Sequence, residues 1–224
     1  MRRFSLLFDL DGTLVDSDAL HLSAFAEVLK GASVVVDEVY YRSHMAGRSN
    51  DLIIAEAFPT ASREQRVMLA ARKEAIYRDS LATIRVVPGA RKTIEWAQSK
   101  GIRCAVVTTS PRASVEAVLE NVDLFRFFNL LVVGDEVQRG KPDPLPYSTA
   151  LLKLGIGPDD AVAFEDSPPG LASATGAGIP TVGMLASLSE RMALLAGAVR
   201  TAKDFRDVGL RLWLEEHHTA SPPM

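Results

Sequence analysis

The feature that most constrains this chain is a pair of carboxylates near its beginning, Asp9 and Asp11, directly after the apolar residues 4–8. Side chains of a strand alternate between its two faces, so residues two positions apart can point the same way from the strand's carboxyl end. Gly12 follows, and a residue without a Cβ lets the backbone turn sharply and approach a ligand. Because two unpaired acids are costly to bury, we expect a divalent cation and a phosphoryl group at residues 9–13.

Three further polar segments interrupt apolar runs downstream. The first places hydroxyl groups at the end of an apolar strand, the second holds a lysine in a Gly-Lys-Pro-Asp-Pro turn, and the third ends another apolar strand in two adjacent acids. The residues concerned are Thr108, Thr109 and Ser110, then Lys141, then Glu165 and Asp166. Each segment alone has an ordinary explanation as a helix cap or a solvated turn. Their occurrence in this order, after the first pair of acids, is much more specific.

Together the four segments resemble the four motifs of the haloacid dehalogenase superfamily, in its phosphotransferase branch. The resemblance implies that Asp9 attacks phosphorus and forms an aspartyl-phosphate. Asp11 would protonate the leaving oxygen and then deprotonate the attacking water. Thr108 and Lys141 would stabilise the oxygens of the transferring group. The second aspartate also argues against a dehalogenase, which lacks it.

The same resemblance implies Mg²⁺ as the cofactor. Mg²⁺ is a hard ion that one or two carboxylates and a substrate phosphate commonly hold. The implied ligands are the Asp9 carboxylate, the backbone carbonyl of Asp11 and Asp166, with Glu165 nearby. The metal would serve as a template and a charge clamp.

The pattern of apolar runs predicts an α/β fold. After Pro88-Gly89, strands alternate with helices, which favours a parallel sheet with helices on both faces and ligands at the carboxyl ends of the strands. The expected strands are 5–8, 104–108, 130–133, 161–165 and 181–184, and the expected helices are 90–99, 113–121, 146–154 and 171–177. The family resemblance makes this a Rossmann-like core.

Helical periodicity marks the stretch between the first two motifs, at 19–29, 51–58 and 63–81. In the family such an insertion is an all-helical cap that closes over the site. We therefore expect a discontinuous catalytic core, an inserted helical cap and a frayed, polar tail. Their ranges are 1–16 with 84–216, 17–83 and 217–224.

Four residues of the expected cap are candidates for substrate binding: His21, Gly47, Arg48 and Asn50. His21 lies in a segment similar to one in the β-phosphoglucomutase-like subgroup, subfamily IA, and Gly47 lies in a loop similar to the substrate-contacting cap loop of relatives. Arg48 could grip a second anionic group through its two-pronged guanidinium. Thr109 and Ser110 add substrate contacts from the core, and Arg112 is a further candidate.

The activity that this resemblance favours is hydrolysis of a small phosphate monoester, such as a sugar phosphate, 2-phosphoglycolate or a nucleotide monophosphate. Mutases of the subgroup carry an arginine where this chain has Asn50, and a lysine where it has Pro111. Both departures favour a phosphatase. A β-phosphoglucomutase-like mutase is the alternative, and a catalytically silent binding protein on the same fold is a third hypothesis.

Composition excludes several other classes. A net charge of −3 over 224 residues gives no electrostatic case for nucleic acid or anionic membrane as a partner. The single Cys104 lies in an apolar run, which predicts a core residue and excludes a disulfide within the chain. No apolar run approaches the ~18–20 residues of a membrane span. We expect a cytoplasmic monomer or weak homodimer.

Overall fold

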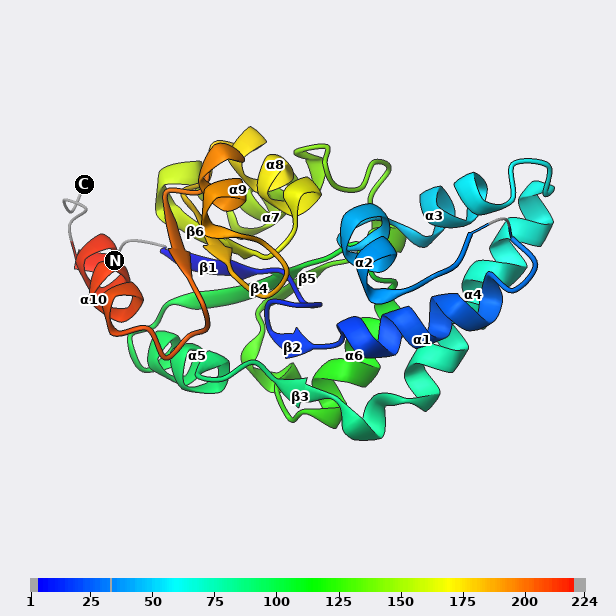
Figure 1. The fold of residues 1–224 in the computed structure, drawn as a ribbon. Coiled ribbons are helices and arrows are strands. Elements are labelled where there is room, and N and C mark those ends of the chain that lie inside the picture. The colour runs from blue at the N-terminus through cyan, green and yellow to red at the C-terminus, as the bar shows by residue number, and fades with distance from the viewer. Residues whose placement is uncertain (1–3, 33, 220–224) are drawn as a thin grey trace.

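The structure is a computed structural model and describes residues 4–32 and 34–219. Its centre is a six-stranded parallel sheet with the strand order β5-β4-β1-β6-β7-β8 (Figure 1). After β1, the chain adds β4 and β5 on one side of it and then adds β6, β7 and β8 on the other side. The direction in which strands are added therefore reverses between β1 and β6. Ligands bind at such reversal points in open α/β sheets. The strands are β1 Ser5–Phe8, β4 Arg103–Val107, β5 Leu130–Val132, β6 Ala161–Glu165, β7 Thr181–Met184 and β8 Arg200–Ala202.

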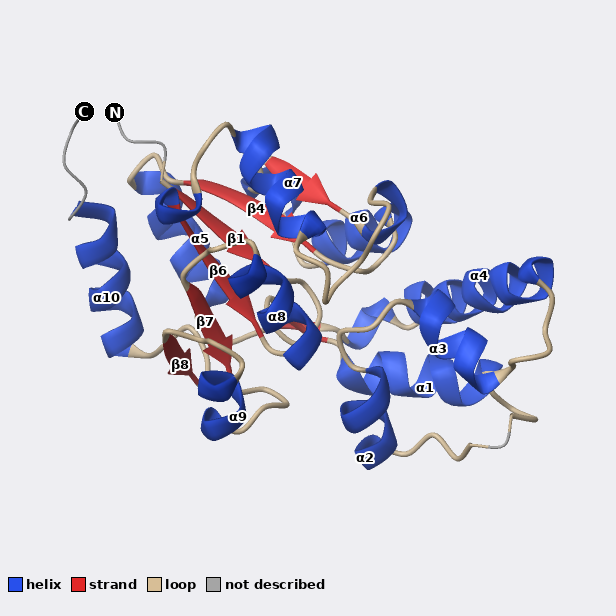
Figure 2. Cartoon of the chain, turned by 90° about the horizontal axis from the view of Figure 1, so that it is seen from above, coloured by secondary structure: helices blue, strands red, loops and turns tan. Residues whose placement is uncertain are grey.

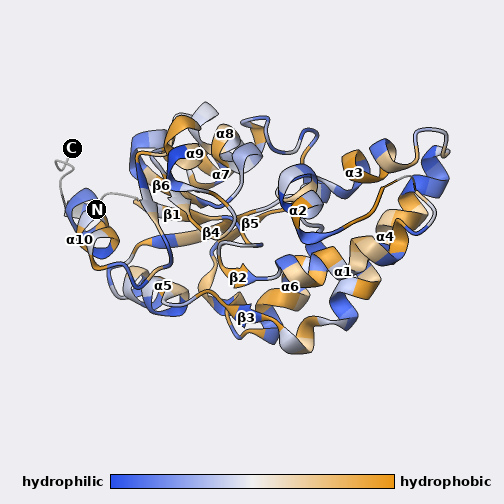
Figure 3. Cartoon of the chain, viewed as in Figure 1, coloured by the Kyte–Doolittle hydropathy of each residue, from blue (hydrophilic) through white to orange (hydrophobic). Residues whose placement is uncertain are grey.

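Helices cover both faces of the sheet because alternate strand residues point to opposite sides. Leu6 and Phe8 of β1 belong to a hydrophobic cluster that includes α5, α6 and α10, whereas Leu7 packs in a second cluster with α7 and α8. The middle of each central strand is accordingly apolar, Cys104–Val107 in β4 and Ala161–Phe164 in β6, as parallel strands covered on both faces are (Figure 3). The core helices are α5 Ala90–Ser99, α6 Arg112–Asn121, α7 Leu145–Leu154, α8 Pro168–Gly176, α9 Glu190–Leu195 and α10 Val208–Thr219.

A second group of helices lies beside the carboxyl ends of the strands (Figure 2). It has its own hydrophobic cluster, which includes Phe25, Tyr41 and Ile54. Its elements are α1 Asp18–Val28, α2 Glu38–Tyr40, a π-helical turn Tyr41–Met45, α3 Asn50–Ala57 and α4 Arg63–Asp79. We propose that this group is the cap. The two chain segments that join it to the core pair with each other as an antiparallel ladder, β2 Val15–Asp16 with β3 Arg85–Val86.

The predicted α/β fold with a parallel sheet and helices on both faces is confirmed. β1, β6, β7 and α5 have the predicted bounds, and the other predicted elements are shifted by one to three residues at one or both ends. The predicted frayed tail is wrong at its start, because α10 continues to Thr219 and includes His217 and His218. Residues 220–224 lie outside the described residues. Among those described, no helix is long and apolar enough to cross a membrane.

Cys104 is confirmed as a core residue. It lies on β4 and is 1% exposed, and burial raises the pKa of its thiol to about 12. A thiol reacts as its thiolate, so we expect no reaction of the folded protein with a thiol reagent at neutral pH. Titration with a coloured disulfide reagent checks this, with the urea-unfolded chain as the control that reacts with one equivalent. Full labelling before unfolding would show that β4 opens readily.

Candidate active site

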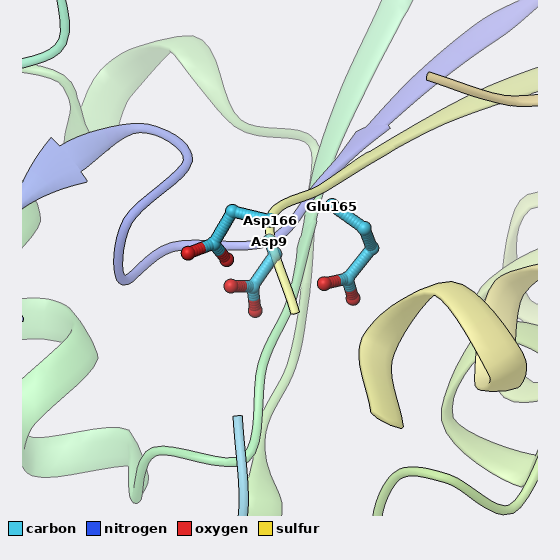
Figure 4. Close-up of side chains that lie close together, drawn as sticks. All are labelled: Asp9, Glu165 and Asp166. Atoms are coloured by element: carbon cyan, nitrogen blue, oxygen red, sulfur yellow. The ribbon is translucent and has the colours of Figure 1, made fainter. Parts of the chain in front are cut away.

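Three carboxylates gather where β1 and β6 end. The register pairs Phe8 with Phe164, so the next residues along the two strands, Asp9 and Glu165, lie beside each other, and Asp166 follows directly. The backbone N–H of Asp9 continues the ladder by donating to the Phe164 carbonyl at 3.0 Å. One oxygen from each of the three acids lies within 4.8 Å of the others, and all three residues are buried (Figure 4). Parallel pairing thus brings together acids that are far apart in the sequence.

One lysine is placed against this cluster. The ammonium of Lys141 donates to Asp9 Oδ1 at 2.6 Å and lies 2.5 Å from Glu165 Oε1, and the side chain is 2% exposed. The hydroxyl of Tyr147, on α7, donates to the same Glu165 oxygen at 2.7 Å. With all three carboxylates ionised, the single ammonium would leave two negative charges in a buried site. A divalent cation has the charge that balances them.

The pKa values of Asp9, Asp166 and Lys141 are shifted in the direction that an excess of negative charge predicts. Burial raises the pKa of Asp9 to about 8; Glu165 adds to the rise and Lys141 opposes it. Burial, Asp9 and Glu165 also raise the pKa of Asp166 well above its usual range. Burial alone would lower the pKa of Lys141, but the two neighbouring carboxylates raise it overall, so this lysine is charged.

The residues present fit a hard divalent cation. All the donors are carboxylate oxygens, as Mg²⁺ prefers, and Glu165 Oε2 is buried without a hydrogen-bond partner. Gly12 has a φ of +77°, and a Cβ at this position would overlap the Asp166 carboxylate, so the glycine makes room for that ligand. The Ser187 hydroxyl donates to the Asp166 backbone carbonyl at 2.9 Å and steadies it.

The Asp11 carboxylate is not part of this cluster and is held by four donors. Oδ1 accepts from the Ser17 hydroxyl at 2.7 Å, from His21 Nε2 at 2.9 Å and from the Tyr77 hydroxyl at 3.1 Å, and Oδ2 accepts from the Ser110 hydroxyl at 2.7 Å. Burial alone would raise the pKa of Asp11, but the contact with His21 and the hydroxyl donors lower it overall. His21 and Tyr77 belong to the cap, so the cap contacts the candidate acid–base residue directly.

A buried chain of side chains continues from His21 across the cap. Lys73 Nζ lies 2.8 Å from His21 Nδ1 and 2.8 Å from Glu74 Oε1, and both α4 residues are buried. An ammonium only donates, so Nδ1 accepts and the proton on Nε2 is directed to Asp11. Glu74 Oε2 in turn accepts from the Ser114 hydroxyl on α6 at 2.5 Å. This series of hydrogen-bonded side chains therefore begins at Asp11 of the core and ends at Ser114 of the core.

The structure brings most of the predicted substrate-binding residues to one cavity of about 40 Å³. Its lining includes Asp9, Asp11 and Asp166 from the core sites, Thr108, Thr109 and Ser110 after β4, and His21, Gly47, Arg48 and Asn50 from the cap. Arg112 is not in this lining, and its guanidinium pairs with Glu116 at 3.1 Å and with Glu136. The prediction for Ser110 needs refinement, because its hydroxyl is bound to Asp11.

Several residues of the site were not found from the sequence, namely Ser17, Lys73, Tyr77, Tyr147 and Ser187. Lys73 carried a usable signal: on a helix it shares the face of Leu69, Ala70 and Tyr77, which pack into the interior. A lysine on an apolar stripe needs a buried partner. Tyr77 carried a similar signal, because a buried tyrosine hydroxyl usually has a hydrogen-bond partner.

The cap loop lies against the core at Gly47. It has a φ of +74°, and a Cβ here would overlap the hydroxyl of Ser167 and approach Pro169. We expect Gly47→Ala to hold the cap away from the core and to lower kcat/KM about 10²-fold, because small displacements of a site are costly. Steady-state kinetics check this.

Gly31→Ala is the matched control for that variant. Gly31 also has a positive φ, +92°, but a Cβ there would have nothing within 4 Å. The control carries the same backbone strain without the steric overlap. An equal loss of activity in both variants would assign the effect to strain in the cap rather than to the contact with Ser167.

The fold and site define a doubly wound α/β protein with an acidic centre at its chain reversal and a helical cap over it. The sequence matches the family of haloacid dehalogenase-like hydrolases over residues 6–184. The chain is 32% identical to the phosphorylated carbohydrates phosphatase of Thermotoga maritima, covering 89% of this chain and 94% of the relative. It is 33% identical to the phosphoglycolate phosphatase of Rhodospirillum rubrum, covering 92% and 89%.

Solved structures agree with these matches. An aspartate-to-asparagine mutant of CbbY from Rhodobacter sphaeroides, crystallised with xylulose-(1,5)bisphosphate, superposes with a TM-score of 0.82 at 30% identity over 93% of this chain and 97% of CbbY. The chain belongs to the haloacid dehalogenase-like hydrolase family.

Proposed function

We propose that this protein is a Mg²⁺-dependent phosphatase that hydrolyses a small phosphate monoester through an aspartyl-phosphate. The observation that carries the proposal is the placement of Asp9 at the end of β1, between a buried lysine and two further acids. A carboxylate beside a fixed cation can approach a phosphate dianion, which would otherwise repel it. The named phosphatases among the relatives support the same activity.

The proposed metal ligands are the carboxylates of Asp9, Asp166 and Glu165 and the backbone carbonyl of Asp11. When bound, the cation neutralises charge on the phosphoryl group and orients it. Asp9 supplies the attacking oxygen. Lys141 keeps one Asp9 oxygen in a fixed position and offers positive charge to the transferring oxygens.

Thr108, Thr109 and Ser110, which follow β4, line the same cavity. Thr108 is 2% exposed, and its Oγ1 accepts from the Ser110 backbone N–H at 3.1 Å, which leaves its own proton available to a phosphoryl oxygen. We therefore assign Thr108 to the transferring group rather than to the leaving group. Thr109 lies next to it in the lining.

Asp11 is the proposed acid–base residue. As bound in this structure it is a carboxylate, which is the form that takes a proton from the attacking water. To protonate the leaving oxygen it must first gain a proton, and loss of a donor such as the Ser110 hydroxyl raises its pKa toward that state. His21 fixes the carboxylate through a bond from the cap, so cap closure and proton transfer are linked.

The test is phosphate release from a panel of small esters, including hexose phosphates and 2-phosphoglycolate, with Mg²⁺ or with EDTA. Release that requires Mg²⁺ supports the proposal. Metal binding has its own readout: Mg²⁺ should raise the melting temperature of the wild type and leave that of Asp166→Asn unchanged. Interconversion of hexose phosphates primed by a bisphosphate, without net release, would instead support the mutase alternative.

A further inference from the structure

Two cationic side chains of the described cap residues, Arg48 and Lys73, line the cavity that also contains Asp9 and Thr108. Each of them already has a carboxylate partner. Arg48 forms a two-pronged ion pair with Glu56, with N–O distances of 2.9 and 2.5 Å, and also donates to the His44 carbonyl. The predicted grip of Arg48 on a second anion would require this pair to break.

Lys73 is paired more firmly because its partner is buried with it. Its Nζ lies 2.8 Å from Glu74 Oε1, and the two side chains are 2% and 7% exposed. Glu74 is also bound by the Asn50 amide at 2.7 Å and by Ser114 from the core. These donors and Lys73 lower the pKa of Glu74 despite its burial, so it is ionised.

The lining that remains for the leaving group mixes apolar side chains, such as Phe25 and Met45, with polar ones. Among the described cap residues of this lining, each Lys or Arg has a carboxylate partner, so no cation is uncompensated. The Lys73 ammonium has three N–H groups, of which His21 and Glu74 take two. Asn50 donates to Glu74 and keeps its amide oxygen as an acceptor. Isolated donors and acceptors of this kind suit hydroxyl groups, which both donate and accept. A second phosphate dianion would lose its water here without gaining an uncompensated cation.

We infer that the site accepts phosphate monoesters whose leaving group carries hydroxyls and no second phosphate, and that Glu74 determines this selectivity by neutralising Lys73. The inference rests on the proposed phosphatase activity and narrows its substrate class to monophosphates of polyhydroxylated compounds. Glu74 lies behind Lys73 and Asn50, so it acts through these two residues and does not itself touch the substrate.

The test compares kcat/KM for a pair of compounds that differ by one phosphate, fructose 6-phosphate and fructose 1,6-bisphosphate, with glucose 6-phosphate and glucose 1,6-bisphosphate as a second pair. The wild type should prefer the monophosphate by about tenfold or more in kcat/KM. A tenfold preference corresponds to about 1.4 kcal/mol of discrimination between the two compounds. Glu74→Gln keeps the shape and removes the charge. It should narrow the preference severalfold, mainly through a lower KM for the bisphosphate.

Glu27→Gln is the matched control. Glu27 is also a cap carboxylate paired with cations, Lys30 and Arg72, but it is outside the cavity lining. It should leave the preference unchanged. Equal use of both compounds by the wild type would overturn the inference even if Glu74→Gln does not fold. So would an unchanged preference in a folded Glu74→Gln, or an equal shift in Glu27→Gln. Failure of the proposed function is a different result, namely no phosphate release from any ester in the panel.

Discussion

Asp9→Asn is expected to reduce phosphate release by a factor on the order of 10⁴ or more, because an amide cannot attack phosphorus. The same change should stabilise the metal-free protein, since it removes one of three buried carboxylates that share a single lysine. Phosphate release and the melting temperature in EDTA measure the two effects. Opposite signs of the two effects are the signature of a functional acid held at a cost in stability.

Asp51→Asn is the control for this experiment. Asp51 is an exposed acid in the first turn of α3, so its neutralisation changes the net charge equally without touching the site. Both measurements should stay close to wild type. Residual turnover in Asp9→Asn within tenfold of wild type would exclude Asp9 as the nucleophile.

Lys141→Met should be the most destabilising substitution in the site. It leaves Asp9 and Glu165 buried without their cation, and breaking a buried pair in this way costs about 3–5 kcal/mol. Activity should be lost as well, because the charge that faces the transferring oxygens is gone. Urea unfolding in EDTA measures the free energy of unfolding, and phosphate release measures the activity.

The double variant Asp9→Asn with Lys141→Met separates charge from packing. It removes one acid together with the cation, so it should be more stable than Lys141→Met alone. Lys153→Met, at an exposed position of α7, is the surface control and should change little. If the double variant were as unstable as Lys141→Met, the loss would come from packing against Tyr147 and not from unpaired charge.

The core half of the site could be predicted because it depends on local pattern. Apolar runs ending in Asp9, Thr108 and Glu165 are strands of one parallel sheet, and the carboxyl ends of such strands share an edge. The ladder between β1 and β6 then places Asp9 beside Glu165 without further information. β8 was missed because Arg200–Ala202 is a short edge strand with no apolar run.

The cap half could not be predicted in the same way. The contacts of Asp11 with Tyr77, and of His21 with Lys73, join residues that are 66 and 52 positions apart in the sequence. The first contact depends on how the cap packs against the core and the second on how α1 packs against α4, and no local periodicity encodes either packing. The pairing of Arg48 with Glu56 is likewise a tertiary fact, and it changes the role that the sequence alone assigns to Arg48.

The ladder between β2 and β3 has a consequence for how such proteins can diversify. Because Asp16 and Arg85 lie opposite each other, the inserted residues between them leave the core and return to it at the same point. A different insert could be joined at this point without disturbing the strands that precede Asp9, Thr108 and Asp166. The strands that carry the clustered acids can therefore be kept while the choice of molecule changes, as long as a new insert supplies partners for Asp11 as His21 and Tyr77 do.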